Sequence, residues 1–425
     1  MASPRNSDVL VVAPRLTFTK RPCGVLIRNG ELGSELEAPL EVVEVLKLFR
    51  KPQRIEALKK ADRRLPDDVL ALLVSRFLLV PIELRDVLRH GAIRASDELP
   101  VGHFSTVSGL LDPKSQAKAA RRFAVMGACV DVGARGEGGA RHGPDAIRKA
   151  FPLRLARSKP KAKLPTVYDL EFHRRIDLGT LELRDLGNVH YVTGESNEAF
   201  GERLEWFARQ ATDGGYCVLG LGGDHSISRS LLRPVLARRQ PFGIVHFDAH
   251  TDLYDVPRGV HTHGNPFDEV LSSTSLQSFF QVGTRQLRVD RGTPVVDGRL
   301  FAASARDVAR LTPEVLFASL NRELPYYLTF DVDCMSPTEC PETGTPVPGG
   351  LTYYQALELF DWLTRHVKII GADFVEVTGP VTRRNQAAQV TANLLSRLIL
   401  SAGTDAPLES QLFRAPPAEA FAFDR

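Results

Sequence analysis

Val245-His-Phe-Asp248-Ala-His250-Thr-Asp252-Leu-Tyr-Asp255 is the stretch of sequence that decides the fold. Apolar residues lead into it as they do in a buried strand, and Asp248, His250 and Asp252 then occupy alternate positions. Because alternate residues of an extended chain point the same way, three metal-binding groups can project together from the carboxyl end of one strand. Open α/β sheets bind their ligands at that edge. Asp and His after a strand are also common turn formers and helix caps, so the stretch alone leaves both interpretations open.

The composition is that of a globular protein. The 425 residues are 43% hydrophobic, which is enough for one large α/β domain and a smaller one. The formal net charge of +3 does not indicate a nucleic-acid partner or an anionic membrane surface. The stretch Met1 to Asp8 is not typical of a signal peptide, and no apolar run has the length of a membrane span. The five scattered cysteines contain no Cys-x-x-Cys pair, so we expect a cytoplasmic protein with reduced thiols.

Residues 1–84 are expected to form a small domain of their own. Gly24 to Arg28, followed by Asn-Gly, is typical of a strand that enters a tight hairpin. Three helical patterns follow, from Pro39 to Phe49, from Pro52 to Lys60 and from Pro66 to Leu79. A hairpin with three small helices indicates a winged-helix-like α+β module without a catalytic constellation. It resembles the leader-peptide-recognising domains of enzymes that modify ribosomally made peptides. Winged helices also bind DNA, but no dense basic recognition helix is present.

The rest of the chain alternates strand-like and helical patterns. Residues 85–119, with several Gly and Pro, are expected to be a linker or arm, and residues 403–425 a tail. The alternation between them, in residues 120–402, predicts a mostly parallel sheet covered by helices on both faces, with the strand-end motifs on one edge. The predicted strands are Arg122 to Val130, Tyr216 to Leu221, Phe242 to Phe247, Phe279 to Gly283, Tyr326 to Phe330 and Ile369 to Val375.

Two further strand ends supply ligands of the same kind. Tyr327-Leu-Thr-Phe-Asp331-Val-Asp333 again places two carboxylates at alternate positions, and a histidine follows the strand that ends at Leu221. So much negative charge cannot stay unpaired at one edge, and the ligands are too many for one tetrahedral zinc. Two divalent cations satisfy both conditions, and oxygen-rich ligation with two imidazoles favours Mn²⁺. The candidate ligands are His225, Asp248, His250, Asp252, Asp331 and Asp333.

Four motifs, in this order, resemble the ureohydrolases, the family of arginase and agmatinase. The resemblance covers roughly Arg121 to Ala402. It implies a three-layer arginase-like α/β fold, hydrolysis of a guanidino group to urea and an amine, two Mn²⁺ per subunit, and a homo-oligomer, commonly a trimer or hexamer. The motifs are Gly-Gly-Asp-His225-Ser, Asp248-Ala-His250-Thr-Asp252, Asp331-Val-Asp333 and Pro341-Glu-Thr-Gly344-Thr-Pro346-Val-Pro-Gly349-Gly350-Leu-Thr.

The resemblance also implies roles for single residues. Glu376 would accept the substrate guanidinium, and His263 would carry the proton to the leaving amine. Both roles suit the reaction, because a guanidinium is a poor electrophile that must be held in line with its nucleophile, and the departing amine must be protonated. The metals would be bridged by Asp248 and Asp331, with His225 and Asp252 completing one site and His250 and Asp333 the other.

The sequence departs from arginase where the rest of the substrate is expected to bind. Arginases hold the α-carboxylate of free arginine with a Ser/Asn-rich stretch, where this chain has Leu253-Tyr-Asp-Val-Pro-Arg258-Gly-Val-His261-Thr. Where arginases place two Asp against the α-ammonium, this chain has Gln286-Leu-Arg288. A buried cation facing an ammonium is unfavourable by several kcal/mol, so free L-arginine is not the expected substrate.

Two substrate classes remain. One is peptidyl arginine, converted to ornithine within a ribosomally made precursor peptide, whose α-groups are amides and need no ion pair. The other is a small guanidino compound, as for an agmatinase or guanidinobutyrase. If it is a guanidino acid, its carboxylate could meet Arg258 or Arg288. The N-terminal module favours the peptide. A protein of another class would keep the catalytic fold as a scaffold and bind peptide or DNA through that module, but the intact ligand set argues against it. A single-zinc deacetylase-type site is disfavoured because Asp252 and Asp333 would be surplus.

Overall fold

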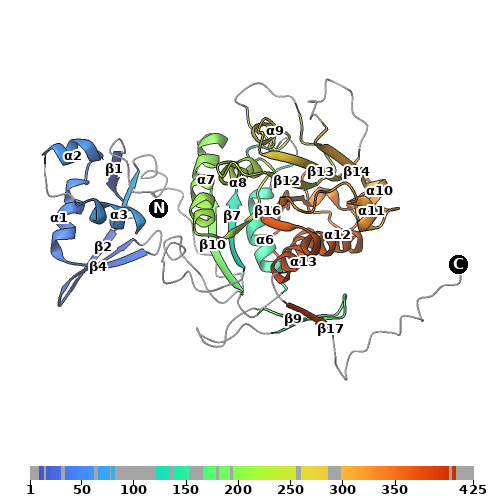
Figure 1. The fold of residues 1–425 in the computed structure, drawn as a ribbon, viewed down its shortest axis with the longest axis horizontal. Coiled ribbons are helices and arrows are strands. Elements are labelled where there is room, and N and C mark those ends of the chain that lie inside the picture. The colour runs from blue at the N-terminus through green and yellow to red at the C-terminus, as the bar shows by residue number, and fades with distance from the viewer. Residues whose placement is uncertain are drawn as a thin grey trace.

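The computed structural model is centred on an eight-stranded parallel sheet with helices on both faces (Figure 1). It describes residues 9–13, 16–29, 34–61, 66–76, 78–81, 121–134, 137–152, 166–178, 181–191, 195–254, 260–285, 298–401 and 404–407. In spatial order the strands are β10 (Glu182–His190), β7 (Arg122–Cys129), β11 (Cys217–Leu221), β16 (Lys368–Val375), β15 (Pro325–Asp331), β12 (Phe242–Phe247), β13 (Leu276–Thr284) and β14 (Leu300–Ser304). The three-layer α/β architecture expected from the sequence is confirmed.

The inner strands are buried on both sides because their alternate residues enter two different hydrophobic cores. In β7, Phe123 and Val125 belong to one core, whereas Ala124 and Met126 belong to the other. This explains the continuous apolar runs, which are typical of parallel strands covered on both faces. The first core is closed by α6 (Gly143–Ala150), α10 (Ala305–Val308), α11 (Pro313–Leu316), α12 (Tyr353–His366) and α13 (Gln386–Leu400), and the second by α7 (Asn197–Asp213), α8 (Ile227–Leu236) and α9 (Asp268–Leu271).

The register of the four central strands brings their carboxyl ends into one row. Phe247 at the end of β12 pairs with Phe330 of β15, Phe330 pairs with Phe374 of β16, and Phe374 pairs with Leu221 of β11. The residues that follow each strand therefore leave the sheet side by side. Any ligands placed just after these strands must meet.

The N-terminal elements form two small antiparallel sheets and three helices, drawn in blue in Figure 1. They pack around a third hydrophobic core that includes Ile27, Phe49 and Leu73. The elements are β1 (Val9–Val12), β2 (Leu16–Arg21), β3 (Gly24–Asn29), β4 (Ser34–Ala38), α1 (Leu40–Leu48), β5 (Gln53–Arg54), α2 (Ile55–Ala61), α3 (Asp67–Ser75) and β6 (Leu79–Pro81). The hairpin strand and three helices expected from the sequence are present.

Two expectations differ from the structure. The third N-terminal helix was expected to reach Leu79, but α3 ends at Ser75 and Leu79 starts β6, because pairing with β1 draws this segment into a sheet. Part of the expected tail, Thr404–Pro407, forms β17, which pairs with β9 (Arg174–Asp177) beside β8 (Val167–Asp169).

The expected linker, residues 85–119, lies outside the described residues. Within the described part of the chain, no helix is long and apolar enough to cross a membrane.

Candidate metal centre

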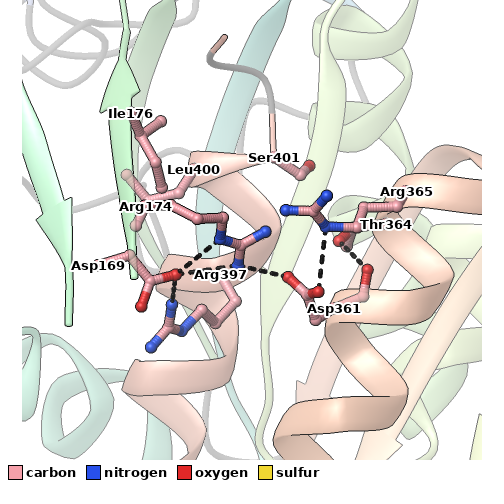
Figure 2. A pocket seen from close by; sticks show the side chains of 9 residues that line it. All are labelled: Asp169, Arg174, Ile176, Asp361, Thr364, Arg365, Arg397, Leu400 and Ser401. Atoms are coloured by element: carbon pink, nitrogen blue, oxygen red, sulfur yellow. Dashed lines mark hydrogen bonds and ion pairs between the residues drawn. The ribbon is translucent and has the colours of Figure 1, made fainter. Parts of the chain in front are cut away.

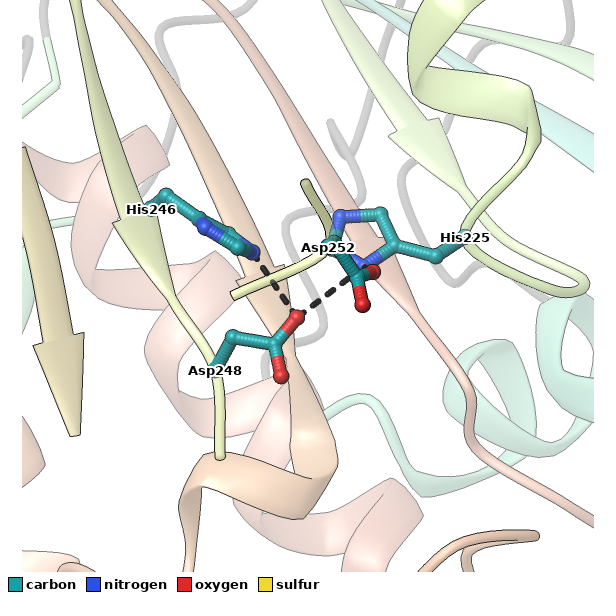
Figure 3. A group of neighbouring side chains, drawn as sticks. All are labelled: His225, His246, Asp248 and Asp252. Atoms are coloured by element: carbon teal, nitrogen blue, oxygen red, sulfur yellow. Dashed lines mark hydrogen bonds and ion pairs between the residues drawn. The ribbon is translucent and has the colours of Figure 1, made fainter. Parts of the chain in front are cut away.

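The six predicted ligands converge at the carboxyl ends of β11, β12 and β15. His225 follows β11, Asp248 follows β12, and Asp331 is the last residue of β15. Figure 3 shows His225, Asp248 and Asp252 directed toward one another. The donor atoms form two groups that share Asp248, within each of which all atoms lie within 4.8 Å of one another: His225, His246, Asp248 and Asp252, and Asp248, His250 and Asp333.

Turn geometry, rather than a continued strand, gathers these side chains. The Oδ1 atom of Asp248 accepts the N–H of His250, and Oδ1 of Asp331 accepts the N–H of Asp333. Each aspartate thus closes a turn onto the residue two positions ahead. The second oxygen of each carboxylate stays directed at His225. The two interpretations left open by the sequence, turn formers and ligands, are therefore compatible in this structure.

His225 lies at the centre of the first group of donor atoms. Its Nδ1 atom lies 3.2 Å from Oδ2 of Asp248, 3.0 Å from Oδ2 of Asp252 and 3.3 Å from Oδ2 of Asp331. This nitrogen is buried and forms no hydrogen bond with acceptable geometry. A buried nitrogen facing three carboxylate oxygens without a hydrogen bond is the arrangement expected of ligands around one cation.

Hydrogen bonds behind His225 fix its ring. Its Nε2 atom lies 2.9 Å from Oγ1 of Thr329, whose hydroxyl donates to Oδ1 of Asp373 at 2.6 Å. The hydroxyl of Tyr327 donates to the other oxygen of Asp373 at 2.7 Å. Since the Thr329 proton goes to Asp373, His225 donates from Nε2 and keeps its Nδ1 lone pair for a cation. Such support behind a ligand is typical of metal-binding histidines.

His250 carries the second group. Its Nδ1 atom lies 2.9 Å from Oδ2 of Asp333 and 3.4 Å from Oδ1 of Asp248. Asp333 is held in place by the N–H of Ala249 and the hydroxyl of Thr345, both 3.0 Å from its carboxylate oxygens. The two oxygens of Asp248 therefore face different histidines, as a bridging ligand requires. The carboxylate of Asp331 contacts His225 of the first group. Its role as a bridge to the second group stays a prediction.

The charges of the centre are unbalanced without cations. Burial raises the pKa of Asp331 well above its ordinary value, and Asp333 and Asp248 raise it further. Burial and Asp248 likewise raise the pKa of Asp252. Burial alone would lower the pKa of His225, but its three carboxylate neighbours raise it well above the ordinary value. Protons are thus held where divalent cations would otherwise balance the carboxylates, and the donor set fits two such ions.

Backbone strain marks two of the predicted site residues. Asp252 and Glu376 have φ angles of 49° and 63°, in the left-handed region that non-glycine residues rarely adopt. The strained turn at Glu376 brings its Oε1 to 2.9 Å from the N–H of His225 and 3.2 Å from Nδ1 of His263. The loop before His225 needs glycine, because a Cβ on Gly223 would lie 2.0 Å from the carbonyl oxygen of Val130. The Gly-Gly of the motif therefore allows His225 to approach the centre.

A cavity of about 310 Å³ opens onto the metal centre. It is lined by His250, Asp252, Tyr254, Thr262, His263, Gly264, Asp331 and Thr345. The predicted substrate residues Arg258 and Arg288 lie outside the described residues. The nearby Arg285 does not face the cavity as a free cation, because its guanidinium donates to backbone carbonyls that include those of Asp333 and Val347.

Comparison with known proteins agrees with the geometry of the centre. The family model described as Arginase family matches residues 121–401. The chain belongs to the arginase family. Agmatinases from Edwardsiella ictaluri and Sodalis glossinidius are 32% and 33% identical to it, over 65% and 66% of this chain and 86% and 87% of their own length. It is therefore a ureohydrolase, a class of enzyme that hydrolyses a C–N bond of a guanidino group.

Solved structures share the arginase-family fold. A hypothetical agmatinase from Burkholderia thailandensis is 28% identical with a TM-score of 0.55, and the match covers 67% of this chain and 85% of that chain. The proclavaminate amidino hydrolase of Streptomyces clavuligerus is 24% identical with a TM-score of 0.55, over 67% and 92% of the two chains. At that identity the second match supports the fold alone. The N-terminal elements lie outside the region that the family model matches.

Sequence reasoning missed His246, which belongs to the first group of donor atoms, and Thr329 and Asp373, which lie behind His225. A signal was available for two of them. His246 and Thr329 each stand two residues before a predicted ligand aspartate, so they point to the same side of their strands. The alternation thus begins inside the strand rather than at its end.

Proposed function

We propose that this ureohydrolase holds two Mn²⁺ ions with six ligands, of which Asp248 and Asp331 are shared, His225 and Asp252 complete one site, and His250 and Asp333 complete the other. The observation that carries the proposal is the sharing of Asp248, whose two oxygens face two different histidines. Bound there, the two ions supply the Lewis acidity that makes water a nucleophile near neutral pH.

Two residues perform the remaining steps, namely His263, which lines the cavity, and Glu376, whose Oε1 atom lies 3.2 Å from Nδ1 of His263. Glu376 offers a buried carboxylate to the cationic guanidinium and holds its carbon in line. Burial lowers the pKa of His263, but Glu376 raises it above the ordinary value. The raised pKa favours the protonated ring of His263, which would donate its proton to the departing amine.

The substrate that we propose is an arginine residue within a precursor peptide, which becomes ornithine as urea is released. Among the described lining residues, the carboxylates are those assigned to the metals, so no further acid is found there to hold an α-ammonium. Tyr254, an exposed aromatic side chain, lines the cavity. Amide-flanked arginine suits such surroundings. The N-terminal elements, outside the family match, would recruit the peptide.

A small guanidino compound is the second candidate. The observation that favours it is the identity of 30–33% with curated agmatinases over most of their length. Agmatine lacks an α-carboxylate, so it avoids one of the two ion pairs that free arginine needs, although its ammonium still requires a partner. The two candidates differ in whether the N-terminal elements take part in substrate binding.

A urea-release assay with Mn²⁺ separates the candidates. The panel contains agmatine, guanidinobutyrate, free arginine and blocked peptides with one internal arginine, and mass spectrometry follows the conversion of peptidyl arginine to ornithine. We expect turnover of the peptides. Turnover of agmatine or guanidinobutyrate without any conversion of the peptides contradicts the peptide assignment, and no urea from any compound contradicts the assignment of a guanidino substrate.

We also propose a homo-oligomer, a trimer or hexamer, that works in the cytoplasm without nucleic acid or membrane. The proposal extends the sequence expectation. Light scattering on the purified protein measures the mass of the assembly, and the mass of a monomer would contradict the proposed oligomer.

A further inference from the structure

His246 is a buried histidine in the metal centre that has no assigned role. It lies in β12, two residues before Asp248, and its Nε2 atom is 2.8 Å from Oδ2 of Asp248 (Figure 3). It also belongs to a group of donor atoms that is close enough to hold a cation. It is therefore either a third imidazole ligand or a support for the aspartate.

The neighbouring Gln281 of β13 distinguishes these roles. Its Nε2 atom lies 2.7 Å from the carbonyl oxygen of Thr251 and 3.1 Å from Nδ1 of His246. Since a carbonyl only accepts, the atom facing Thr251 must be the amide nitrogen, which has two hydrogens to donate. The second hydrogen points at Nδ1 of His246. That ring nitrogen is thus the acceptor, and the hydrogen of the neutral imidazole sits on Nε2.

We infer that His246 is a positioning residue that donates a hydrogen bond to Asp248 and sets the orientation of this carboxylate between the two metals. Neither ring nitrogen is left to bind a cation, because Nδ1 accepts from Gln281 and Nε2 carries the hydrogen. Rotation of Asp248 about its side chain would break the His246 bond. The bond therefore holds Oδ2 toward His225 and Oδ1 toward His250. The inference rests on the proposed binuclear centre.

Aromatic rings keep this arrangement in place. His246 packs against Phe267 and Phe279, with ring centroids 4.8 and 5.8 Å apart, and its side chain is fully buried. In such apolar surroundings an unpaired polar group is costly, so each hydrogen bond of the chain Thr251, Gln281, His246 and Asp248 reinforces the next. These aromatic contacts also allow a control, since a substitution of Phe279 alters the packing around His246 without removing a hydrogen bond.

The test compares Mn²⁺ affinity in full-length protein stripped of metal. His246→Phe keeps a ring but removes the donor, and we expect metal affinity to fall about 10- to 100-fold, the usual cost of losing a partner behind a ligand. His246→Gln can place an amide N–H near the position of Nε2, so it should keep affinity within a few-fold. Phe279→Leu is the packing control and should also stay near wild type. Titration calorimetry measures affinity, and electron paramagnetic resonance reports whether the two ions form a coupled pair.

Each other outcome overturns the inference. Unchanged affinity in His246→Phe shows that Asp248 needs no donor, and equal losses in both His246 variants indicate direct ligation instead. An equal loss in Phe279→Leu assigns the effect to packing. If His246→Phe does not fold, His246→Gln decides alone, because glutamine retains the donor but replaces an imidazole ligand poorly. Wild-type protein that binds no pair of Mn²⁺ ions overturns the proposed centre together with the inference, whereas a normal pair in wild type and His246→Phe overturns the inference alone.

Discussion

Two clusters of charged side chains in this molecule solve the same electrostatic problem in different ways. In the cluster shown in Figure 2, Asp169 pairs with Arg174 and Arg397, and Asp361 pairs with Arg174 and Arg365. In the metal centre of Figure 3, no Lys or Arg among the described residues pairs with the four ligand aspartates. The aspartates of the first cluster are paired with guanidinium groups, whereas those of the metal centre face histidines among the described residues.

The pKa values reflect this difference. Burial alone would raise the pKa of Asp169, but Arg397 and Arg174 hold it below its ordinary value. Burial raises the pKa of Asp331, and its carboxylate neighbours raise it further. A buried carboxylate is stable as an anion only where a cation accompanies it. The guanidinium-paired cluster is therefore complete as folded, whereas the centre at the carboxyl edge needs cations from outside the chain.

The largest effect is expected from removing the shared ligand of the metal centre. Asp248→Asn should abolish urea release and weaken Mn²⁺ binding by more than the 10- to 100-fold typical of residues behind a ligand, because an amide cannot replace a bridging carboxylate. Metal analysis and the urea assay measure both effects. The matched control is Asp169→Asn, which removes a buried carboxylate that has guanidinium partners and should leave both metals bound. If the two variants lose metal alike, the contrast between the clusters is wrong.

The sequence predicted the metal centre better than the guanidinium-paired cluster for a physical reason. Five of the ligands lie two residues apart in the motifs that follow the adjacent strands β12 and β15, and His225 follows β11, which is separated from β15 by β16 alone. Local periodicity and parallel pairing therefore bring them together. Arg397 and Asp169 are 228 residues apart and meet only through the packing of α13 beside the β8–β9 hairpin. A contact between residues so far apart in the chain cannot be predicted from any short sequence motif. For the stretch at Asp248 the sequence left a turn open as an alternative, and the turn at Asp331 was not predicted, since alternation is equally consistent with an extended strand.

The second prediction removes the cations instead of a ligand. Chelation should abolish urea release, and added Mn²⁺ should restore it. Rebinding at a concentration 1,000-fold above the dissociation constant should stabilise the fold by about 4 kcal/mol for each ion, because the cations bind the folded centre alone. Thermal unfolding with and without Mn²⁺ measures this. Full activity after exhaustive chelation, verified by metal analysis, contradicts the requirement for external cations.

A smaller loss is expected when the metals stay and only the substrate carboxylate is changed. Glu376→Gln keeps the size and shape of the side chain but removes the charge that is proposed to face the guanidinium. We expect both Mn²⁺ ions to remain and turnover to fall at least about 100-fold, as for a misplaced reacting group. Metal content and kcat are measured on the same preparation. Turnover at the wild-type level in a fully metallated variant overturns the role of Glu376.

The smallest effect on activity is expected from Arg397→Met, which tests the guanidinium-paired cluster. The variant should keep its metals and turnover but lose about 3 kcal/mol of stability, the low end of the cost of breaking a buried pair, since Asp169 retains Arg174. The pKa of Asp169 is depressed in the folded protein, so the stabilisation is present above the unfolded value near 4 and is lost as the pH falls through the folded value. The difference in unfolding free energy between wild type and variant, measured with denaturant, should therefore shrink below about pH 4. A difference that stays constant into acid assigns the loss to packing of the Arg397 stem over Phe172, whose ring lies 5.3 Å from the guanidinium carbon.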